Sequence, residues 1–226
     1  DATESAAKMD WEFRSTEYVE PLTTLAEVVA LDEEAAKRNR PVDAEVTVTY
    51  HHPADYLFFV QDQTDGVYVT TDNTSVEWLA GGTKIRLMGN TVQGFLKHNI
   101  QDAEYEILEQ GAFPEPIICD LESLQTGDFD ARYVVTSGQV REAVRVGNGA
   151  QLKILTQTGS FSVVMRGLSA DKDPSMWVDS VVTFTGVAGF QYENQKPVGV
   201  ILYVENESHV EVIRSRPYDV LPPELV

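Results

Sequence analysis

Residues 41–69 read PVDAEVTVTYHHPADYLFFVQDQTDGVYV, and this stretch decides the fold class. Apolar and polar side chains alternate over 42–50, which is the period of a strand with one buried face. Apolar runs at 56–61 and 67–71 predict two more strands. The residues between these runs, DQTDG at 62–66, are typical of a tight turn, so the stretch predicts three consecutive strands.

The sequence before this stretch predicts two short helices. Thr24 can accept a hydrogen bond from the amide of Glu27 while the Glu27 side chain reaches back, which forms a capping box at a helix start. The segment 32–38 has its acidic residues first and its basic residues last, as the helix dipole favours. Pro41 ends this second helix, because proline breaks a helix interior.

Two further strands complete the first half of the chain. They are predicted at 84–92 and 102–108, and an interval without strand character precedes them at 74–82. Trp78 and Leu79 supply the apolar side chains of this interval, which we expect to act as a plug. Three strands, a plug and two strands are the layout of an oligonucleotide/oligosaccharide-binding (OB) barrel.

The second half of the chain repeats the first. Residues 115–117 (EPI) repeat residues 20–22 (EPL), Trp177 takes the place of Trp78, and Gly186 takes that of Gly89. A repeat of this length indicates tandem domains rather than a solenoid. The corresponding elements are a helix at 120–124, strands at 133–146, 151–157, 160–166, 181–191 and 197–204, and a plug at 169–179.

We therefore predict an all-β protein with short helices, built from two tandem five-stranded OB-like barrels. One continuous β-sandwich of about ten strands is the alternative, and the repeated helix-then-strand openings argue against it. The predicted boundaries are 1–20 for a polar leader, 21–113 and 114–213 for the two barrels, and 214–226 for a proline-containing exit linker.

The charge balance argues against a partner that is itself an anion. The chain has 36 Asp and Glu against 17 Lys and Arg, which gives a formal net charge of -19. Proteins bind nucleic acid through clustered cations, so nucleic acid and anionic membranes are predicted to be poor partners. Alternation places Asp102, Glu104 and Glu106 on one face of their strand, which we expect to face solvent.

The sequence leaves the cellular compartment open. The single cysteine, Cys119, cannot form an intramolecular disulfide, and its apolar neighbours predict a buried thiol. No window approaches 18 consecutive apolar residues, so no membrane-spanning helix is expected within the chain. The first residue is Asp1 rather than Met, so we expect that a signal peptide or an anchor could lie outside this segment.

Neither a catalytic constellation nor a metal or cofactor site is predicted. The sequence contains no G-x-S-x-G elbow and no CxxC or Cys/His cluster. His51 and His52 are adjacent on a strand and point to opposite faces, so they cannot easily chelate one ion together. Residues 62–66 share some features of a calcium loop, but a hairpin turn explains them without an ion. We expect the protein not to be an enzyme.

The candidate ligand contacts are aromatic and cationic residues near the barrel loops. OB barrels bind oligonucleotides or oligosaccharides on a concave sheet face framed by loops. Most aromatic residues should be core, with Phe58 and Phe59 facing opposite ways. The predicted ligand-binding residues are Tyr68, Phe95, Lys97 and His98 in the first barrel, and Tyr192 and Arg141 in the second.

The pattern of strands and turns resembles one family. The opening PLTTLAEV at 21–28, the strand at 41–50 and the hairpin FVQDQTDGVYV at 59–69 resemble the extracytoplasmic sensor regions of bacterial membrane histidine kinases and diguanylate cyclases. The periplasmic parts of these proteins consist of tandem OB-like units. The resemblance covers residues 21–212. It departs at Glu45, where that family usually has Gly, and in the second hairpin, which keeps only its Thr and Gly.

The resemblance implies a non-catalytic sensing or interaction region of a bacterial signal-transduction protein. Such a region would lie in the periplasm or outside the cell, and its partner would be an unidentified small molecule, glycan or protein. A ligand would favour one relative orientation of the barrels, with residues 109–114 acting as a hinge. The alternative is a secreted carbohydrate- or oligonucleotide-binding OB-fold protein that acts on its own.

Overall fold

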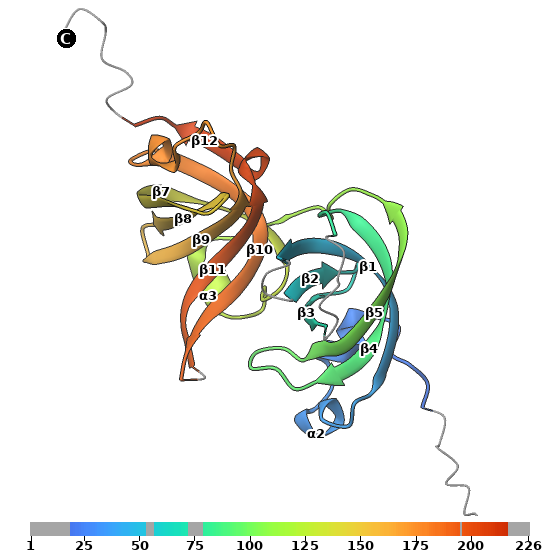
Figure 1. Cartoon of the computed structure of the whole chain (residues 1–226). Coiled ribbons are helices and arrows are strands. Elements are labelled where there is room, and N and C mark those ends of the chain that lie inside the picture. Colours follow the sequence, from blue (N-terminus) through green and yellow to red (C-terminus); the bar gives the residue numbers. More distant parts are fainter. Residues whose placement is uncertain (1–18, 53–56, 72–78, 195, 217–226) are drawn as a thin grey trace, which may run out of the picture.

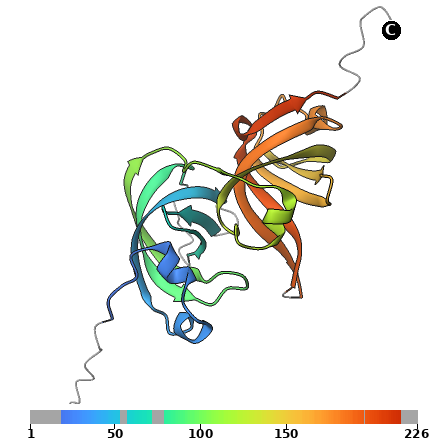
Figure 2. The same cartoon turned by 180° about the vertical axis from the view of Figure 1, so that it is seen from behind.

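The computed structural model describes residues 19–52, 57–71, 79–194 and 196–216. Two β-barrels lie side by side, and the chain enters through the first and leaves from the second (Figure 1). Seen from behind, the segment after the first barrel crosses to the second and leads into a short helix (Figure 2). The predicted plug residue Trp78 lies outside the described residues.

Five strands close the first barrel in the order β1-β2-β3-β5-β4. The strand β3 runs parallel to β5, and the other pairs are antiparallel. The first half of β1 pairs with β4 and its second half with β2, with a register shift between Val48 and Tyr50, so one long strand curves around the barrel. The strands are β1 (Pro41–His52), β2 (Leu57–Gln61), β3 (Gly66–Thr70), β4 (Thr83–Val92) and β5 (Asn99–Gln110).

The second barrel repeats this arrangement. Its sheet has the order β12-β10-β11-β9-β8-β7-β6, and an additional pairing of β10 with β7 closes a ring of five strands. Strands β9 and β11 run parallel, as β3 and β5 do. The ring strands are β7 (Tyr133–Val146), β8 (Gly149–Leu155), β9 (Ser160–Gly167), β10 (Val181–Glu193) and β11 (Lys196–Asn206), and the added strands are β6 (Ile117–Ile118) and β12 (Val210–Arg214).

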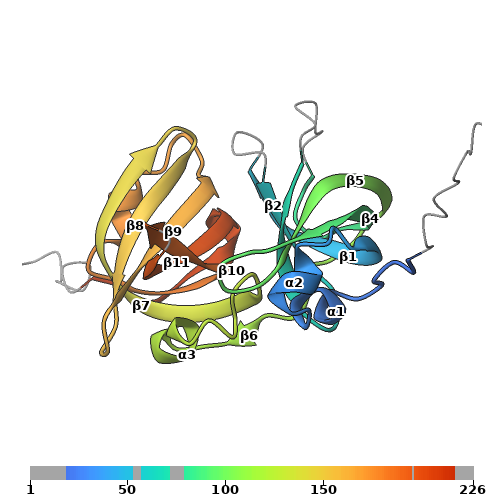
Figure 3. The same cartoon turned by 90° about the horizontal axis from the view of Figure 1, so that it is seen from below.

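Short helices pack against the barrels. The helices α1 (Leu25–Val29) and α2 (Glu33–Ala36) lie beneath the first barrel and α3 (Leu121–Gln125) beneath the second (Figure 3). Thr24 and Glu27 form the predicted capping box at the start of α1. Two 3₁₀ helices, η2 (Pro174–Trp177) and η3 (Glu207–His209), complete the described elements. None of the described helices is long and apolar enough to cross a membrane.

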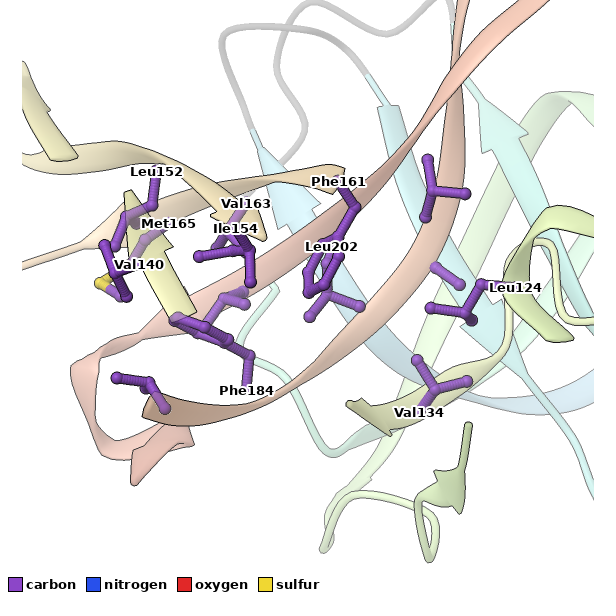
Figure 4. Close-up of a cluster of buried hydrophobic side chains, with 14 of the residues drawn as sticks. Leu124, Val134, Val140, Leu152, Ile154, Phe161, Val163, Met165, Phe184 and Leu202 are labelled. Carbon is purple, nitrogen blue, oxygen red and sulfur yellow. The ribbon is translucent and has the colours of Figure 1, made fainter. Parts of the chain in front are cut away.

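Each barrel has its own hydrophobic core. The core of the second barrel draws on its strands, on α3 through Leu124 and on η2 through Trp177 (Figure 4). The core of the first barrel contains Leu25 and Val28 of α1 together with Phe58. The neighbouring residue Phe59 belongs to a third cluster, so Phe58 and Phe59 face opposite ways as predicted.

The third cluster joins the two barrels. Its buried members are Tyr50 and Phe59 from the first barrel and Ala131, Tyr133 and Val187 from the second. The amide of Tyr133 donates to Gln61 Oε1 at 2.8 Å, which adds a buried polar link. Two barrels that share a buried aromatic cluster are held in one orientation, because separating them would expose this apolar surface.

The connection at 109–114 is part of this junction. Phe113 stacks on Tyr133 with ring centroids 4.9 Å apart and an interplanar angle of 12°. The amide of Gly111 donates to the carbonyl of Gly82 at 3.1 Å. The predicted hinge is therefore a packed connection, and sequence alone could not show the surfaces that cover it.

The structure confirms the predicted fold class of two tandem five-stranded OB-like barrels with short helices. The element bounds agree with the prediction to within two residues, apart from the strand predicted at 102–108, which starts at Asn99. The strands β6 and β12 and the 3₁₀ helix η3 were not predicted. Most of β12 is exposed, so it lacks the alternation of a half-buried strand. Its last residue is Arg214, where the exit linker was predicted to begin.

Candidate functional site

Two loops from different barrels meet beside the junction. The loop between β4 and β5 reaches toward the hairpin of β10 and β11 (Figure 1), and it brings Phe95 against Tyr192. The two ring centroids are 5.0 Å apart with an interplanar angle of 32°. Phe95 is 64% exposed and Tyr192 is 36% exposed. We call this exposed pair the aromatic platform.

Apolar neighbours surround the aromatic platform. Leu96 is exposed, and its Cδ2 would lie 3.5 Å from a Cβ added at Gly127 in the second barrel. Val198 is exposed on β11, beside the position that faces Tyr192 across the hairpin. The loop tip of the first barrel is thus in contact with the second barrel, and the platform belongs to both.

A cluster of charges lies at the base of the same loop. Lys97 Nζ is 2.6 Å from Asp65 Oδ1, and its side chain is only 9% exposed. Arg132 of the second barrel approaches the same carboxylate at 3.5 Å and donates to the carbonyl of Thr64 at 3.1 Å. These contacts tie Asp65 of the first barrel to the second barrel, so they position the platform rather than offer charge to a ligand.

Asp130 adds a second carboxyl to this cluster. Burial raises its pKa to about 6, the Coulombic attraction of Lys97 opposes this rise, and the charge of Asp65 adds to it. Burial also raises the pKa of Tyr192 to about 12, with a further contribution from Asp130. The Tyr192 hydroxyl is therefore neutral at physiological pH, and Asp130 titrates close to the platform.

The structure separates the six predicted ligand-binding residues. It brings Phe95 and Tyr192 together and places Lys97 in the ion pairs beside them. His98 Nε2 lies 2.9 Å from the carbonyl oxygen of Leu31, so this ring contacts the segment after α1. The other two predicted residues, Tyr68 and Arg141, lie elsewhere.

Tyr68 and Arg141 have structural partners away from the platform. Tyr68 packs edge-on against Phe59 with centroids 5.5 Å apart, within the cluster between the barrels. Arg141 is 3.2 Å from Asp179, which precedes the start of β10, whereas Tyr192 lies near its end. Tyr68 therefore belongs to the inter-barrel cluster, and Arg141 lies toward the opposite end of β10 from Tyr192.

The second barrel covers part of the sheet face that OB folds commonly use. That face is carried by the second and third strands. Here Phe59 of β2 and Tyr68 of β3 pack into the inter-barrel cluster. The ring centroids of Phe59 and Tyr203 of β11 are 5.2 Å apart. Among the described residues of the first barrel, the loop between β4 and β5 offers exposed side chains beside this face.

Sequence reasoning missed Asp130 and Arg132. Both lie in the irregular segment between α3 and β7, where no hydrophobic period assigns a role to any side chain. Their importance depends on Asp65 and Lys97, which are distant in sequence. The repeat offered the only signal, because it placed this segment directly before the first strand of the second barrel.

The histidines and the acidic turn have structural roles. His51 is buried, and its Nδ1 accepts a hydrogen bond from the amide of Leu79 at 3.0 Å; burial lowers its pKa to about 4. Asp62 accepts from the amide of Leu25 at 2.8 Å, so the turn between β2 and β3 caps α1. Within the described ranges, no group of three or more His, Cys, Asp or Glu side chains could hold a metal ion.

Comparison with known proteins finds no matching family model and no matching curated protein. Among solved structures, a murine DNA-binding protein bound to double-stranded DNA is 14% identical, with 77% of this chain and 96% of that chain covered and a TM-score of 0.37. The Ifi202 HINa domain in complex with 20-bp double-stranded DNA is 12% identical, with coverage of 79% and 97% and a TM-score of 0.36. The tetrameric p202 HIN2 is 14% identical, with coverage of 86% and 100% and a TM-score of 0.34.

These comparisons correct three predictions. The similar structures named here are HIN and DNA-binding proteins, so the resemblance to sensor regions of membrane kinases and cyclases is wrong, and so is the sensing function that it implied. The prediction that singled out nucleic acid as a poor partner is corrected as well: two of these similar structures contain double-stranded DNA. The resemblance rested on strands and turns, which tandem OB barrels share whatever they bind.

Proposed function

We propose that this protein is a non-catalytic OB-fold binding protein that acts on its own and holds a single-stranded oligonucleotide on the aromatic platform. The observation that carries the proposal is the contact of Phe95 with Tyr192. Phe95 lies in the loop after the fourth strand of the first barrel, and Tyr192 lies at the end of the fourth strand of the second. OB folds bind oligonucleotides with this loop, among others, and bases stack on exposed aromatic rings.

Stacking favours a single strand over a duplex. The bases of a duplex are already stacked on one another, whereas those of a single strand can turn onto the exposed face of Phe95. Each stack of a base on an aromatic ring contributes about 1–3 kcal/mol. The platform offers two rings, so we expect weak binding that tolerates changes in base sequence.

The charges near the platform set the expected response to salt. Lys97 and Arg132 are committed to Asp65, and the other cation nearby is the exposed Lys196 at the start of β11. Affinity for nucleic acid falls with salt in proportion to the number of phosphates that the protein neutralises. With a net charge of -19, we expect affinity to depend little on salt or to rise with it.

A neutral oligosaccharide is the second candidate ligand, and the charge is the observation that favours it. Sugar rings present apolar faces that can pack on Phe95, and a neutral ligand is not repelled by the acidic surface. OB folds bind oligosaccharides as well as oligonucleotides. The two candidates would use the same ring, so a binding experiment must include both.

Fluorescence anisotropy with labelled oligo(dT) tests the proposal. Phe95→Ala should weaken binding about tenfold, since it removes one stack. Met176→Ala, which truncates another exposed apolar side chain, in η2, is the control and should leave binding unchanged. Unlabelled oligosaccharides are added as competitors.

Two results would count against oligonucleotide binding. Equal affinity of the wild type and Phe95→Ala would remove the platform from the site. Displacement of oligo(dT) by a neutral oligosaccharide at lower concentration than by unlabelled oligo(dT) would favour the second candidate. The absence of catalysis and a location outside the cytoplasm are further parts of the proposal, which a turnover screen and cell fractionation would test.

A further inference from the structure

A groove with both polar and apolar lining residues runs along the outside of the second barrel, and it shares no residue with the aromatic platform. It has a volume of about 1140 Å³ and lies between the start of α3, the turn after β8 and the outward faces of β7 and β10. Val135 and Val181 contribute to its floor, and Ile118 and Leu155 to its rim. Arg214, the last residue of β12, also lines it.

The first barrel has a groove at the corresponding place. It lies between the start of α1, the turn after β2 and the outward faces of β1 and β4, with a volume of about 950 Å³. One wall of this groove is the segment that follows the last strand of the barrel, which contributes Ala112, Pro114 and Glu115. In the first barrel, the chain that leaves the last strand therefore runs along the groove.

The groove of the second barrel has no such wall among the described residues. Ile118 at its rim is 87% exposed, and Leu155 is also exposed. The last strands correspond in register, because Gln110 of β5 pairs with Thr83 at the start of β4 and Arg214 of β12 pairs with Val181 at the start of β10. The segment that would supply the missing wall is therefore the one that follows Arg214.

The sequence of residues 217–226 is compatible with the groove of the second barrel. Residues 217–226 read PYDVLPPELV, and the wall of the first groove lies within AFPEPI at 112–117. Each segment has an aromatic residue soon after the last strand, followed by prolines, which favour an extended chain without backbone donors. Four aliphatic side chains in 217–226 could cover Ile118 and Leu155, and burial of apolar surface is favourable by about 25 cal/mol per Å².

We propose that residues 217–226 dock along the groove of the second barrel, as the segment after β5 lies along the groove of the first. The docked segment shields Ile118 and completes the repeat. This inference is independent of the oligonucleotide proposal, since it uses no residue of the aromatic platform.

Nuclear magnetic resonance of the full chain and of a chain ending at Arg216 tests the docking. Removal of the segment should shift the amide signals of groove residues such as Ile118, Leu155 and Thr183 and leave those of Phe95 and Tyr192 in place. Ile118→Asp in the full chain should produce the same shifts at Leu155 and Thr183 and speed trimming by a carboxypeptidase several-fold. Val144→Asp, at another exposed position of the same barrel, is the control and should do neither.

Several outcomes would overturn the docking. Identical groove signals in the two chains would show that the segment does not touch the groove. Shifts that depend on protein concentration would assign the groove to a second copy of the chain. Trimming at equal rates in Ile118→Asp and Val144→Asp would show that Ile118 does not hold the segment.

Discussion

The protonation state of Asp130 affects the stability of the contact between the two barrels. Its carboxyl lies in the cluster of Asp65, Lys97 and Arg132, where burial raises its pKa to about 6 from a reference value of 3.8. The folded protein therefore binds a proton more tightly than the unfolded chain does. The resulting stabilisation is present at low pH and is lost as the pH rises through about 6.

Asp130→Asn should stabilise the protein above pH 7. The amide cannot ionise, so the variant avoids the cost of a buried carboxylate, which we put at about 1–2 kcal/mol at this partly exposed site. The difference in melting temperature between variant and wild type should vanish near pH 4, where both are uncharged at this position.

Thermal melts at pH 4, 6 and 8 measure this difference. Asp128→Asn, two residues away and exposed, is the control and should show no such pH dependence. An Asp130→Asn variant that is less stable than the wild type at pH 8 would mean that attraction to Lys97 outweighs the cost of burial.

Single residues also show what sequence reasoning could reach at the site. It selected Phe95 and Tyr192 because both are aromatic residues beside the last hairpin of a barrel, and the structure places them in contact. It also selected Lys97 as an exposed cation, but an ion pair with Asp65 buries that side chain. A partner more than thirty residues away leaves no trace in local patterns.

The elements themselves were largely predictable because each carries a local signal. Alternation predicted β1, the capping box predicted α1, and the internal repeat then predicted α3 and β7. The strand β12 was missed because it is short and mostly exposed, so packing on β10 creates it rather than its own pattern. Sequence patterns therefore predict helices and strands that bury one face, whereas an exposed strand such as β12 depends on its pairing with a neighbouring strand.

The contact between α1 and the turn after β2 gives a prediction for these elements. Asp62 accepts from the amide of Leu25, and Thr64 Oγ1 accepts from the amide of Ala26 at 3.0 Å. Asp62→Ala removes an acceptor for the first turn of α1 and should lower the free energy of unfolding by about 1–2 kcal/mol. Urea denaturation measures the change.

Calcium provides a direct check on this reading of the turn. If Asp62 serves as a helix cap, calcium should raise the melting temperature of neither the wild type nor Asp62→Ala. Asp171→Ala, at an exposed loop position of the second barrel, should cost less than 0.5 kcal/mol as a control. A melting temperature that calcium raises only in the wild type would restore the calcium-loop interpretation.

At the scale of the whole molecule, contacts at the junction hold the two barrels together. Arg166 of the second barrel donates to the carbonyl of His51 at 2.6 Å and to Glu205 at 2.8 Å. Glu205 in turn accepts from the amide of Gly81 in the first barrel at 3.0 Å. Alternation predicted Tyr50 on the same buried face as Val48, but a register shift between these residues places Tyr50 in the cluster between the barrels, which no sequence pattern could show.

Removal of only one partner of the ion pair at the junction should lower the free energy of unfolding. Arg166→Met leaves the Glu205 carboxylate without its cation in a largely buried place, and we expect a loss of about 3 kcal/mol. The double variant Arg166→Met/Glu205→Gln should recover most of that loss, because glutamine is neutral and still accepts from Gly81. Chemical denaturation of the single and double variants measures the coupling.

The exposed pair of Lys84 and Glu109 serves as the control for this cycle. Lys84 Nζ is 2.6 Å from Glu109 Oε1, but both side chains are more than half exposed, so Lys84→Met should lower the free energy of unfolding much less than Arg166→Met does. Equal losses for Arg166→Met and Lys84→Met would contradict a buried polar link between the barrels.

The central claim is that the two barrels together build one exposed aromatic platform that binds a single strand. Titration of the ¹⁵N-labelled chain with oligo(dT), followed by nuclear magnetic resonance, tests it most directly. We predict that the signals that move belong to the loop holding Phe95 and to the hairpin holding Tyr192, and that those of the second barrel's groove stay in place. Shifts confined to the groove, or none at either low or high salt, would contradict the account.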